Sequence, residues 1–244
     1  MSHPVLVVAD IHGNLEALKA VLKDAAGLYE DIWVLGDIAG YGPDPGPCLD
    51  MLWRRKALMV AGNHDRAACS QVGIEDFNPE ARAAVELHRI ALSADQRDVL
   101  AALPEMLVRR SITLVHGRPD NPIWGYVLSD SAAAGVLRTA ETSLTLSGHS
   151  HLVNLWAYDP NLGARSRPVA YDEEYSYSGV PHLANPGSVG QSRDGDVSAR
   201  YLIVNPDRKT LLFRRCDWRR KATRRKMMMR GYPASLIDRM APAG

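Results

Sequence analysis

The chain has 244 residues, of which 46% are hydrophobic and 23% are charged, and its formal net charge is +1. These values are ordinary for a globular protein with a full core, and they give no bulk charge that would indicate nucleic acid or a membrane surface as partner. The three cysteines are far apart, which favours reduced thiols over a disulfide framework. No apolar run approaches membrane-spanning length, and no signal-peptide core precedes Asp10. We therefore expect one soluble, cytoplasmic domain spanning residues 1–244.

The first quarter of the chain alternates short apolar runs with helical patterns. Strands are expected at Val5–Ala9, Ile32–Leu35 and Ala57–Ala61, because each is a short apolar run that leads into polar residues or glycine. Helices are expected between them, at Asn14–Ala26 and Gly46–Lys56, where apolar residues recur at helical spacing. This β-α-β-α-β order predicts a parallel sheet with right-handed crossovers.

The middle of the chain begins with a helical excursion at residues 66–103. It contains two expected helices, Pro79–Leu92 and Ser93–Leu103, the second with Ser93 as N-cap. Strands, loops and helices then alternate in the order strand 106–108, tight turn 109–111, strand 112–115, loop 118–126, helix 129–139 and strand 143–147.

The last third of the chain is dominated by expected antiparallel strands. Turn signals rich in Pro, Gly, Asn and Asp separate strands at 152–158, 166–171, 200–205 and 210–216, and a loop is expected at 185–188. The C-terminal segment 218–240 is expected to be helical, with a break at 231–233.

Polar side chains of metal-ligand type follow five of these strands. Open α/β sheets place their ligands at the C-terminal ends of strands, and carboxylates with imidazoles bind divalent ions of the zinc, manganese or iron kind. A single histidine after a strand is more often structural, but the same feature at five strand ends indicates a common site. Of the other histidines, we expect His3 at the terminus, His88 on a helix surface and His182 outside the site. The strand-end residues are Asp10, His12, Asp37, Asn63, His64, His116, His149 and His151.

Five short motifs contain these residues, in the order Asp10-x-His12-Gly13-Asn14, Gly36-Asp37 with Gly40-Tyr41-Gly42, Gly62-Asn63-His64-Asp65, His116-Gly117 and Gly148-His149-x-His151. Together they resemble the calcineurin-like metallophosphoesterase superfamily, and the chain is most similar to its compact prokaryotic phosphodiesterases. No ligand of the family pattern is replaced, and the loop at 185–188 agrees with the resemblance. The resemblance implies an α/β (α+β) fold, a four-layer α-β-β-α sandwich of two mixed sheets flanked by helices, with the metal site at the strand C-terminal ends.

The resemblance also implies a role for each matching residue. One divalent ion would be held by Asp10, His12, Asp37 and His151, and the other by Asp37, Asn63, His116 and His149. Two ions sharing Asp37 would acidify a bridging water to hydroxide, which attacks phosphorus. The mixed ligands leave the metal open among Mn, Fe, Zn, Ni and Co.

The resemblance places His64 beside this ligand set without joining it. His64 would stabilise charge in the transition state or protonate the leaving oxygen. Asp65 would orient His64 or, as an alternative, cap the helix that follows it.

The function that follows is hydrolysis of phosphodiester bonds, with phosphomonoesters as a further class, in nucleotide-type substrates. Two rival activities stay open, a dinucleoside polyphosphate hydrolase and a serine/threonine protein phosphatase. A non-catalytic scaffold of the same fold that binds a protein partner is a remote alternative, because loss of activity usually leaves gaps among the ligands and here there are none. The sequence does not determine the oligomeric state.

Substrate-binding candidates lie in loops near the motifs. Asn63 is one of them, and its neighbours could include aromatic side chains that stack on a base. Ordinary loop packing is the favoured alternative for each aromatic residue. We expect the excursion 66–103 and the loop 118–126 to form the rim that selects the substrate, because both leave directly from motif residues. The further candidates are Tyr41, Arg118, Trp124, Tyr126 and Arg193.

The segment Arg214–Arg230 contains nine basic residues and a single acid, Asp217. A solvated helix face is the favoured interpretation over a nucleic-acid interface, because the chain has no net basic charge. The expected partner is a small phosphoester or nucleotide substrate, without membrane or nucleic acid.

Overall fold

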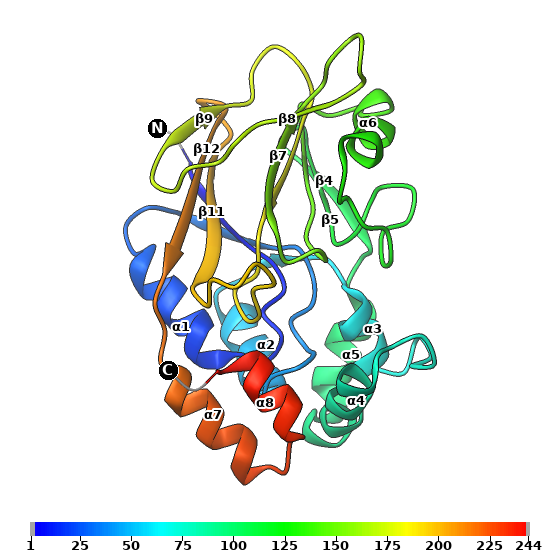
Figure 1. Ribbon diagram of the computed structural model, residues 1–244, viewed down its shortest axis with the longest axis vertical. Helices are drawn as coiled ribbons and strands as arrows, with labels where there is room; N and C mark the ends of the chain where they lie inside the picture. Colours follow the sequence, from blue (N-terminus) through cyan, green and yellow to red (C-terminus); the bar gives the residue numbers. More distant parts are fainter. Residues whose placement is uncertain (1–2, 243–244) are drawn as a thin grey trace.

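Two six-stranded mixed sheets form the centre of the fold in the computed structural model, which describes residues 3–242 (Figure 1). In the first sheet, the three N-terminal strands are parallel and the rest are antiparallel. The parallel part follows from the β-α-β-α-β order, since the helices return the chain to the same edge. In spatial order the strands are β3 (Leu58–Met59), β2 (Asp31–Val34), β1 (Val5–Val8), β11 (Ala199–Asn205), β12 (Thr210–Cys216) and β9 (Glu174–Ser176).

The second sheet contains three neighbouring parallel strands, β5, β6 and β10, with antiparallel strands on both sides. The register aligns Ile112 of β5 and His182 of β10 with Leu144 of β6, so the three strands end at the same edge. In spatial order the strands are β4 (Met106–Arg109), β5 (Ile112–Val115), β6 (Leu144–Leu146), β10 (His182–Pro186), β7 (Val153–Ala157) and β8 (Arg165–Ser166).

Helices cover the outer face of each sheet, which confirms the predicted α-β-β-α order of layers. Alternate residues of β1 point to opposite sides: Leu6 and Val8 pack with helices α1 and α2, whereas Val5 and Val7 pack against the second sheet. Helix α6 covers the far face of the second sheet through Trp156 of β7 and Leu183 of β10. The helices are α1 (Leu15–Asp24), α2 (Pro45–Arg54), α3 (Asn63–Ala68), α4 (Pro79–Ala91), α5 (Ala94–Ala102), α6 (Asp130–Arg138), α7 (Arg220–Met229) and α8 (Ala234–Met240).

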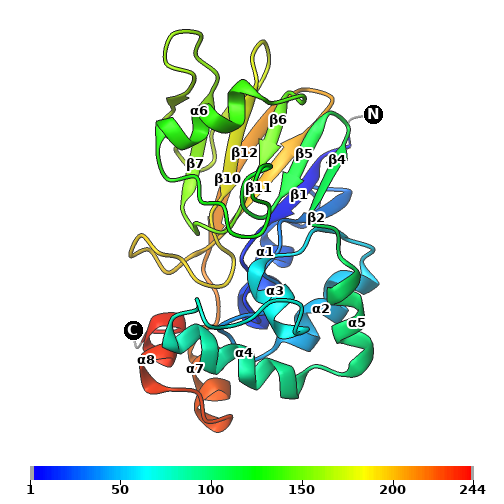
Figure 2. The same cartoon turned by 90° about the vertical axis from the view of Figure 1, so that its right-hand side faces the viewer.

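A separate group of helices lies beneath the ends of the strands, in the lower half of Figures 1 and 2. It contains the predicted excursion, now helices α3, α4 and α5, and the predicted C-terminal segment, now α7 and α8 with a break at Gly231 (φ +73°). Ala84 and Val85 of α4 form one buried cluster with Leu236 and Ile237 of α8. The C-terminal helix is thus fixed beside the excursion, next to the strand ends.

Most predicted elements are present with ends shifted by a few residues. Ser93 caps α5 as predicted: its hydroxyl accepts from Gln96 N–H, and the Gln96 side chain accepts from Ser93 N–H. Within residues 3–242, no helix has both the length and the apolar character needed to cross a bilayer.

Two predictions about the later strands are wrong. The strand expected at 166–171 is reduced to the two residues of β8, because Pro168 has no N–H to donate to a ladder. The loop expected at 185–188 begins inside β10, a central strand that the sequence analysis missed. Its Asn-Pro pair indicates a turn, but Pro186 is the last residue of the strand and pairs with Val153, where a proline is tolerated.

Candidate metal centre

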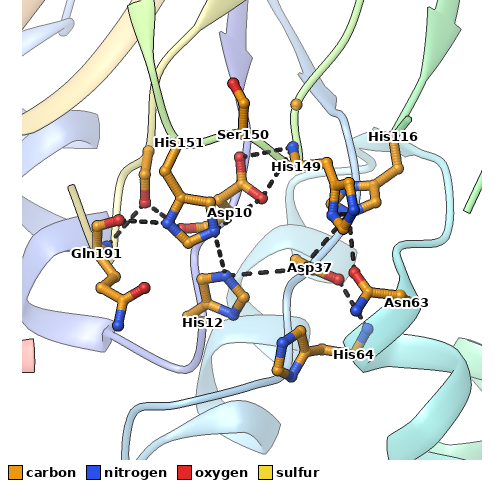
Figure 3. Close-up of polar contacts among 12 residues, drawn as sticks. Asp10, His12, Asp37, Asn63, His64, His116, His149, Ser150, His151 and Gln191 are labelled. Atoms are coloured by element: carbon orange, nitrogen blue, oxygen red, sulfur yellow. Dashed lines mark hydrogen bonds and ion pairs between the residues drawn. The ribbon is translucent and has the colours of Figure 1, made fainter. Parts of the chain in front are cut away.

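All eight strand-end residues predicted from the sequence lie together at the junction of the sheets and the lower helices (Figure 3). Asp10 and His12 follow β1, Asp37 follows β2, and His116 follows β5. His149 and His151 follow β6, whereas Asn63 and His64 begin helix α3. All eight residues are buried, with at most 5% of their surface exposed. The edge that the parallel strands share therefore collects these side chains, as expected for open α/β sheets.

The first group contains Asp10, His12 and His151. The His12 Nδ1–H donates to the Ala39 carbonyl at 3.1 Å, and the His151 Nδ1–H donates to the Gln191 carbonyl. The Nε2 atom of each neutral ring is therefore without a proton, and these two Nε2 atoms lie 3.0 Å apart. Asp10 Oδ1 lies 3.5 Å from His151 Nε2. Two facing lone pairs beside a carboxylate repel one another unless a cation lies among them.

The second group contains Asn63, His116 and His149. The His116 Nδ1–H donates to the Leu35 carbonyl at 2.8 Å, which leaves Nε2 without a proton. This Nε2 atom faces Asn63 Oδ1 at 3.1 Å and His149 Nδ1 at 3.0 Å. An oxygen acceptor and a bare imidazole nitrogen thus converge on one point, which again fits a cation.

Asp37 lies between the two groups. Its Oδ2 atom is 3.6 Å from His12 Nε2 and 3.5 Å from His116 Nε2, while its Oδ1 atom accepts from the His64 N–H at 2.9 Å. One carboxylate oxygen therefore reaches both groups, and the other holds the carboxylate in place.

The electrostatics of the site agree with bound cations. Burial raises the pKa of the Asp10 carboxyl to about 7 and raises the pKa of Asp37 well above its usual value. Burial also lowers the pKa of His149 to about 2 and the pKa values of His12 and His151 well below the usual range. These histidines are neutral at pH 7 and present lone pairs, and His149 Nε2 has no hydrogen-bond partner. Divalent cations would stabilise the two carboxylates in their charged form and use the free lone pairs.

The backbone is unusual at the same positions. Asp10, His12, Asp37, His149 and His151 all have φ between 49° and 65°, the left-handed region that non-glycine residues rarely adopt. Each strand therefore turns sharply where its ligand begins, which aims the side chain back toward the common centre. Gly62 permits this packing, because a Cβ atom there would lie 2.1 Å from Asp37 Oδ1.

His64 lies next to the ligands but on the open side. Its ring centroid is 4.9 Å from that of His12, and its buried Nδ1 atom has no hydrogen-bond partner. Burial and the nearby His116 lower its pKa, so the ring is neutral at pH 7.

Asp65 does not contact the His64 ring, which corrects the expectation that it orients that histidine. Its carboxylate accepts from the N–H groups of Ala39 and Gly62, at 2.8 and 3.0 Å. Asp65 therefore closes the first turn of α3 and ties it to the loop after β2, as in the alternative capping role.

A cavity of 160 Å³ opens over His64, Asp37 and Asn63. Of the predicted substrate-binding candidates, Tyr41, Trp124, Tyr126 and Arg193 line it. Arg118 does not, because it lies at another hollow and pairs with Asp120 at 2.7 Å. Asp76, Phe77, Asn78 and Ala81 also line the cavity and belong to the excursion 66–103 that was expected to form its rim, whereas the sequence analysis missed Arg239.

Two of the three aromatic candidates pack against candidate ligands, and the third packs against another residue of the cavity. Tyr126 stacks on His149 with ring centroids 3.9 Å apart, and the buried Tyr41 lies 4.7 Å from His12. Trp124 packs edge-on against Phe77 at 5.4 Å. Both Trp124 and Tyr126 keep an exposed face, 38% and 43% of their surface.

The prediction that His88 lies on a helix surface is wrong. The buried stripe of α4 runs through Ala81, Ala84, Val85 and His88 at helical spacing, whereas Ile90, counted as apolar, is 85% exposed. His88 Nδ1 accepts from Gly40 N–H at 3.0 Å, and its Nε2–H donates to the Gly42 carbonyl. The histidine thus holds the loop that carries Tyr41.

The basic segment Arg214–Arg230 is only partly a solvated face. Lys226 pairs with Glu16 at 2.9 Å and with the buried Asp44 at 2.7 Å, and Arg230 pairs with Asp44 at 3.0 Å. These pairs attach α7 and the residue after it to α1 and to the loop before α2. The other basic side chains of α7 border a groove of 880 Å³ that contains none of the candidate ligands.

Comparison with known proteins gives consistent matches over most of the chain. The family model of the calcineurin-like phosphoesterase superfamily domain matches residues 4–209. The uncharacterized protein MJ0912 of Methanocaldococcus jannaschii is 31% identical over 242 residues, covering 97% of this chain and 96% of that protein. The crystal structure of a metallophosphoesterase from Sphaerobacter thermophilus has a TM-score of 0.88 and 36% identity, and covers the whole of both chains. A hypothetical protein, PH1004 from Pyrococcus horikoshii OT3, shares the fold with a TM-score of 0.82 at 20% identity, over 98% of each chain.

Proposed function

Because the chain belongs to the calcineurin-like phosphoesterase superfamily, we propose that it is a phosphoesterase with two divalent metal ions that hydrolyses phosphodiester bonds of nucleotide-type substrates. The observation that carries this proposal is the position of Asp37 Oδ2, 3.6 Å from His12 Nε2 and 3.5 Å from His116 Nε2. One oxygen that reaches two groups of ligands is the arrangement needed for a shared carboxylate between two ions.

Each group of residues has a defined task in this proposal. The first ion would be held by Asp10, His12, Asp37 and His151, and the second by Asp37, Asn63, His116 and His149. Ions bound there supply Lewis-acid activation of water and of phosphoryl oxygens. The backbone carbonyls of Ala39, Leu35 and Gln191 fix the tautomers of three ligand histidines, so that each presents a lone pair to the centre.

His64 is the proposed catalytic residue that is not a ligand. Its ring lines the cavity beside Asn63, where the non-bridging or leaving oxygen of a phosphoester would lie. As a neutral imidazole it donates an N–H to the charge that develops on that oxygen. This favours stabilisation of the transition state over full protonation of the leaving group.

Tyr41, Trp124, Tyr126 and Arg193 are proposed to contact the substrate outside the reacting phosphate. The exposed faces of Trp124 and Tyr126 are suited to stacking on a base. Since the three cysteines are free thiols, we propose a reducing, cytoplasmic location and a single domain.

The decisive experiment is an assay of the purified protein on bis-p-nitrophenyl phosphate. We expect hydrolysis with manganese, and we expect it to disappear on chelation and return when metal is restored. Absence of hydrolysis with each of manganese, cobalt, nickel, zinc and iron would contradict the proposal, and metal binding without hydrolysis would favour the scaffold alternative. A panel of cyclic nucleotides, dinucleoside polyphosphates and phosphopeptides then separates the phosphodiesterase from its two enzymatic rivals.

A further inference from the structure

Two arginines at the mouth of the cavity have no acidic partner. Arg193 lies in the loop after β10 and Arg239 in helix α8, and both side chains are exposed and line the cavity. Within residues 3–242, neither has a carboxylate oxygen within 4.0 Å, whereas other arginines of the C-terminal half do, among them Arg200, Arg214, Arg224 and Arg230. Two free cations have thus been brought from distant segments to one opening.

Arg239 is one aromatic ring away from the candidate ligands. Its guanidinium carbon lies 5.3 Å from the centre of the Tyr41 ring, and that ring lies 4.7 Å from His12 and 4.8 Å from His64. The position is well defined, because Leu236, Ile237 and Met240 of the same short helix are buried. The cation is therefore held on the far side of the Tyr41 ring from the two histidines.

The charges of the opening do not match a simple phosphodiester. Asp76 is the one acidic residue among the described cavity-lining residues besides the candidate ligand Asp37. A phosphodiester carries a single negative charge, and the candidate metal centre already faces that charge. Even with Asp76 offsetting one arginine, the opening keeps an excess positive charge beside that phosphate, so it fits a ligand with further negative charge next to the scissile group.

The volume of the cavity agrees with this. Pockets that enclose a whole small-molecule ligand measure about 300 to 1,000 Å³. The 160 Å³ here accommodates the phosphate part of a substrate, while a nucleoside would lie over the exposed faces of Trp124 and Tyr126.

We propose that Arg193 and Arg239 bind a second phosphate joined to the scissile one, so that the substrate is an ester of a diphosphate or longer polyphosphate chain. This inference rests on the proposed phosphoesterase function and selects, among its candidate substrates, the polyphosphate esters to which the dinucleoside polyphosphate alternative belongs. Arg239 lies beyond residues 4–209, the range matched by the family model, so the second phosphate site depends on a helix that the family match does not include.

The test compares the affinity of the manganese-loaded protein for methylenediphosphonate and for methylphosphonate, which carry two phosphonates and one and are not hydrolysed. Calorimetry at fixed free manganese makes chelation equal for all variants. For Arg239→Gln and for Arg193→Gln we expect the preference for the diphosphonate to fall about tenfold. Arg239→Lys, which keeps the charge, should retain part of it. Arg225→Gln removes an equally exposed cation from α7, away from the cavity, and should leave the preference unchanged.

Two results would overturn the inference. One is an unchanged preference in both glutamine variants, and the other is an equal fall in Arg225→Gln, which would reduce the effect to general charge. The binding measurement is independent of turnover. A protein that hydrolyses bis-p-nitrophenyl phosphate but shows no preference for the diphosphonate keeps its proposed function and loses this inference. A protein that shows the arginine-dependent preference but hydrolyses no ester loses the proposed function alone.

Discussion

The candidate ligands and the residues around the mouth of the cavity are built in opposite ways. The ligands are buried at the shared edge of the two sheets. All but Asn63 lie in the turn that follows a strand, and Asn63 is the first residue of α3. The residues at the mouth are mostly exposed and come from five separate segments: the loop after β2, residues 76–81 leading into α4, the loop 118–126, the loop after β10, and α8. The candidate ligands thus lie on the rigid scaffold of the two sheets. The residues that would select the substrate lie on segments that can change without disturbing that scaffold.

This contrast makes predictions of different size for the two regions. Substitutions among the ligands should abolish metal binding and turnover together. Substitutions at the mouth should change the choice of substrate and leave the metal content as it is.

The largest effect is expected for Asp37→Ala, which removes the one oxygen that lies between both ligand groups. We expect loss of both ions and a fall in turnover of more than about 10³-fold, which corresponds to more than about 4 kcal/mol. Metal analysis of the purified variant measures the first effect and the bis-p-nitrophenyl phosphate assay the second. Retention of one full equivalent of metal would show that Asp37 does not bridge.

His64→Ala should separate chemistry from metal binding. We expect full metal content with turnover about 10²- to 10³-fold lower, since the ring contributes to transition-state stabilisation only. The matched control is His182→Gln. It alters a buried histidine at the first residue of β10, the end of this strand that lies away from the candidate metal centre. A metal-free His64→Ala protein would place His64 among the ligands instead.

The buried state of His88, which holds the loop carrying Tyr41, can be tested by varying the pH. Burial lowers its folded-state pKa to about 4, from an ordinary value of 6.5. A histidine that is harder to protonate when folded stabilises the protein fully above pH 6.5, and this contribution is lost as the pH falls toward 4. The expected loss is about 3 kcal/mol at pH 4. Denaturant unfolding of wild type and His88→Gln should show a stability difference that shrinks below pH 6.5. A difference that is constant from pH 7 to 4 would contradict the buried, neutral state.

The smallest effect is expected at the aromatic residues of the mouth. Trp124→Ala and Tyr126→Ala should lower kcat/KM about tenfold on a nucleotide ester, or about 1.4 kcal/mol, the size of one stacking contact. The small aryl diester should lose much less, because it has no base to stack. Equal losses on both substrates, or no loss on either, would return these residues to a packing role.

The residue pattern was sufficient to predict the first parallel strands and the eight clustered side chains, whereas the two-sheet sandwich and its helical cover were implied by the family resemblance. The reason is physical: each ligand is adjacent to a strand, so local hydrophobic patterning also predicts where its side chain is delivered. The same patterning gave no signal for β10, whose Asn185 and Pro186 indicate a turn although the strand lies between β6 and β7.

The mouth of the cavity was predicted only in part: the rim segments 66–103 and 118–126 were expected, but Arg239 joins them through packing between helices, which the sequence pattern does not show. In the sequence, nothing distinguishes Arg239 from an ordinary surface arginine. In the structure, Leu236 and Ile237 pack α8 against α4 and so bring Arg239 to the cavity. Arg118 shows the converse, since its place directly after a motif suggested the site, but its pairing with Asp120 turns it to another hollow. The position of His88 was predicted wrongly because the sequence does not distinguish a buried histidine from an exposed one. Its burial is evident only from its hydrogen bonds with Gly40 and Gly42.

The left-handed backbone at Asp10, His12, Asp37, His149 and His151 has a consequence for how such a centre can evolve. A non-glycine residue in this region costs about 1 kcal/mol or more, so five of them together cost about 5 kcal/mol. That is as large as the whole net stability of many natural domains. Glycine at any of these positions would relieve the strain and delete the ligand, so selection for stability alone would erode the centre. The five strained residues are therefore a cost in stability that the candidate ligands impose on the fold.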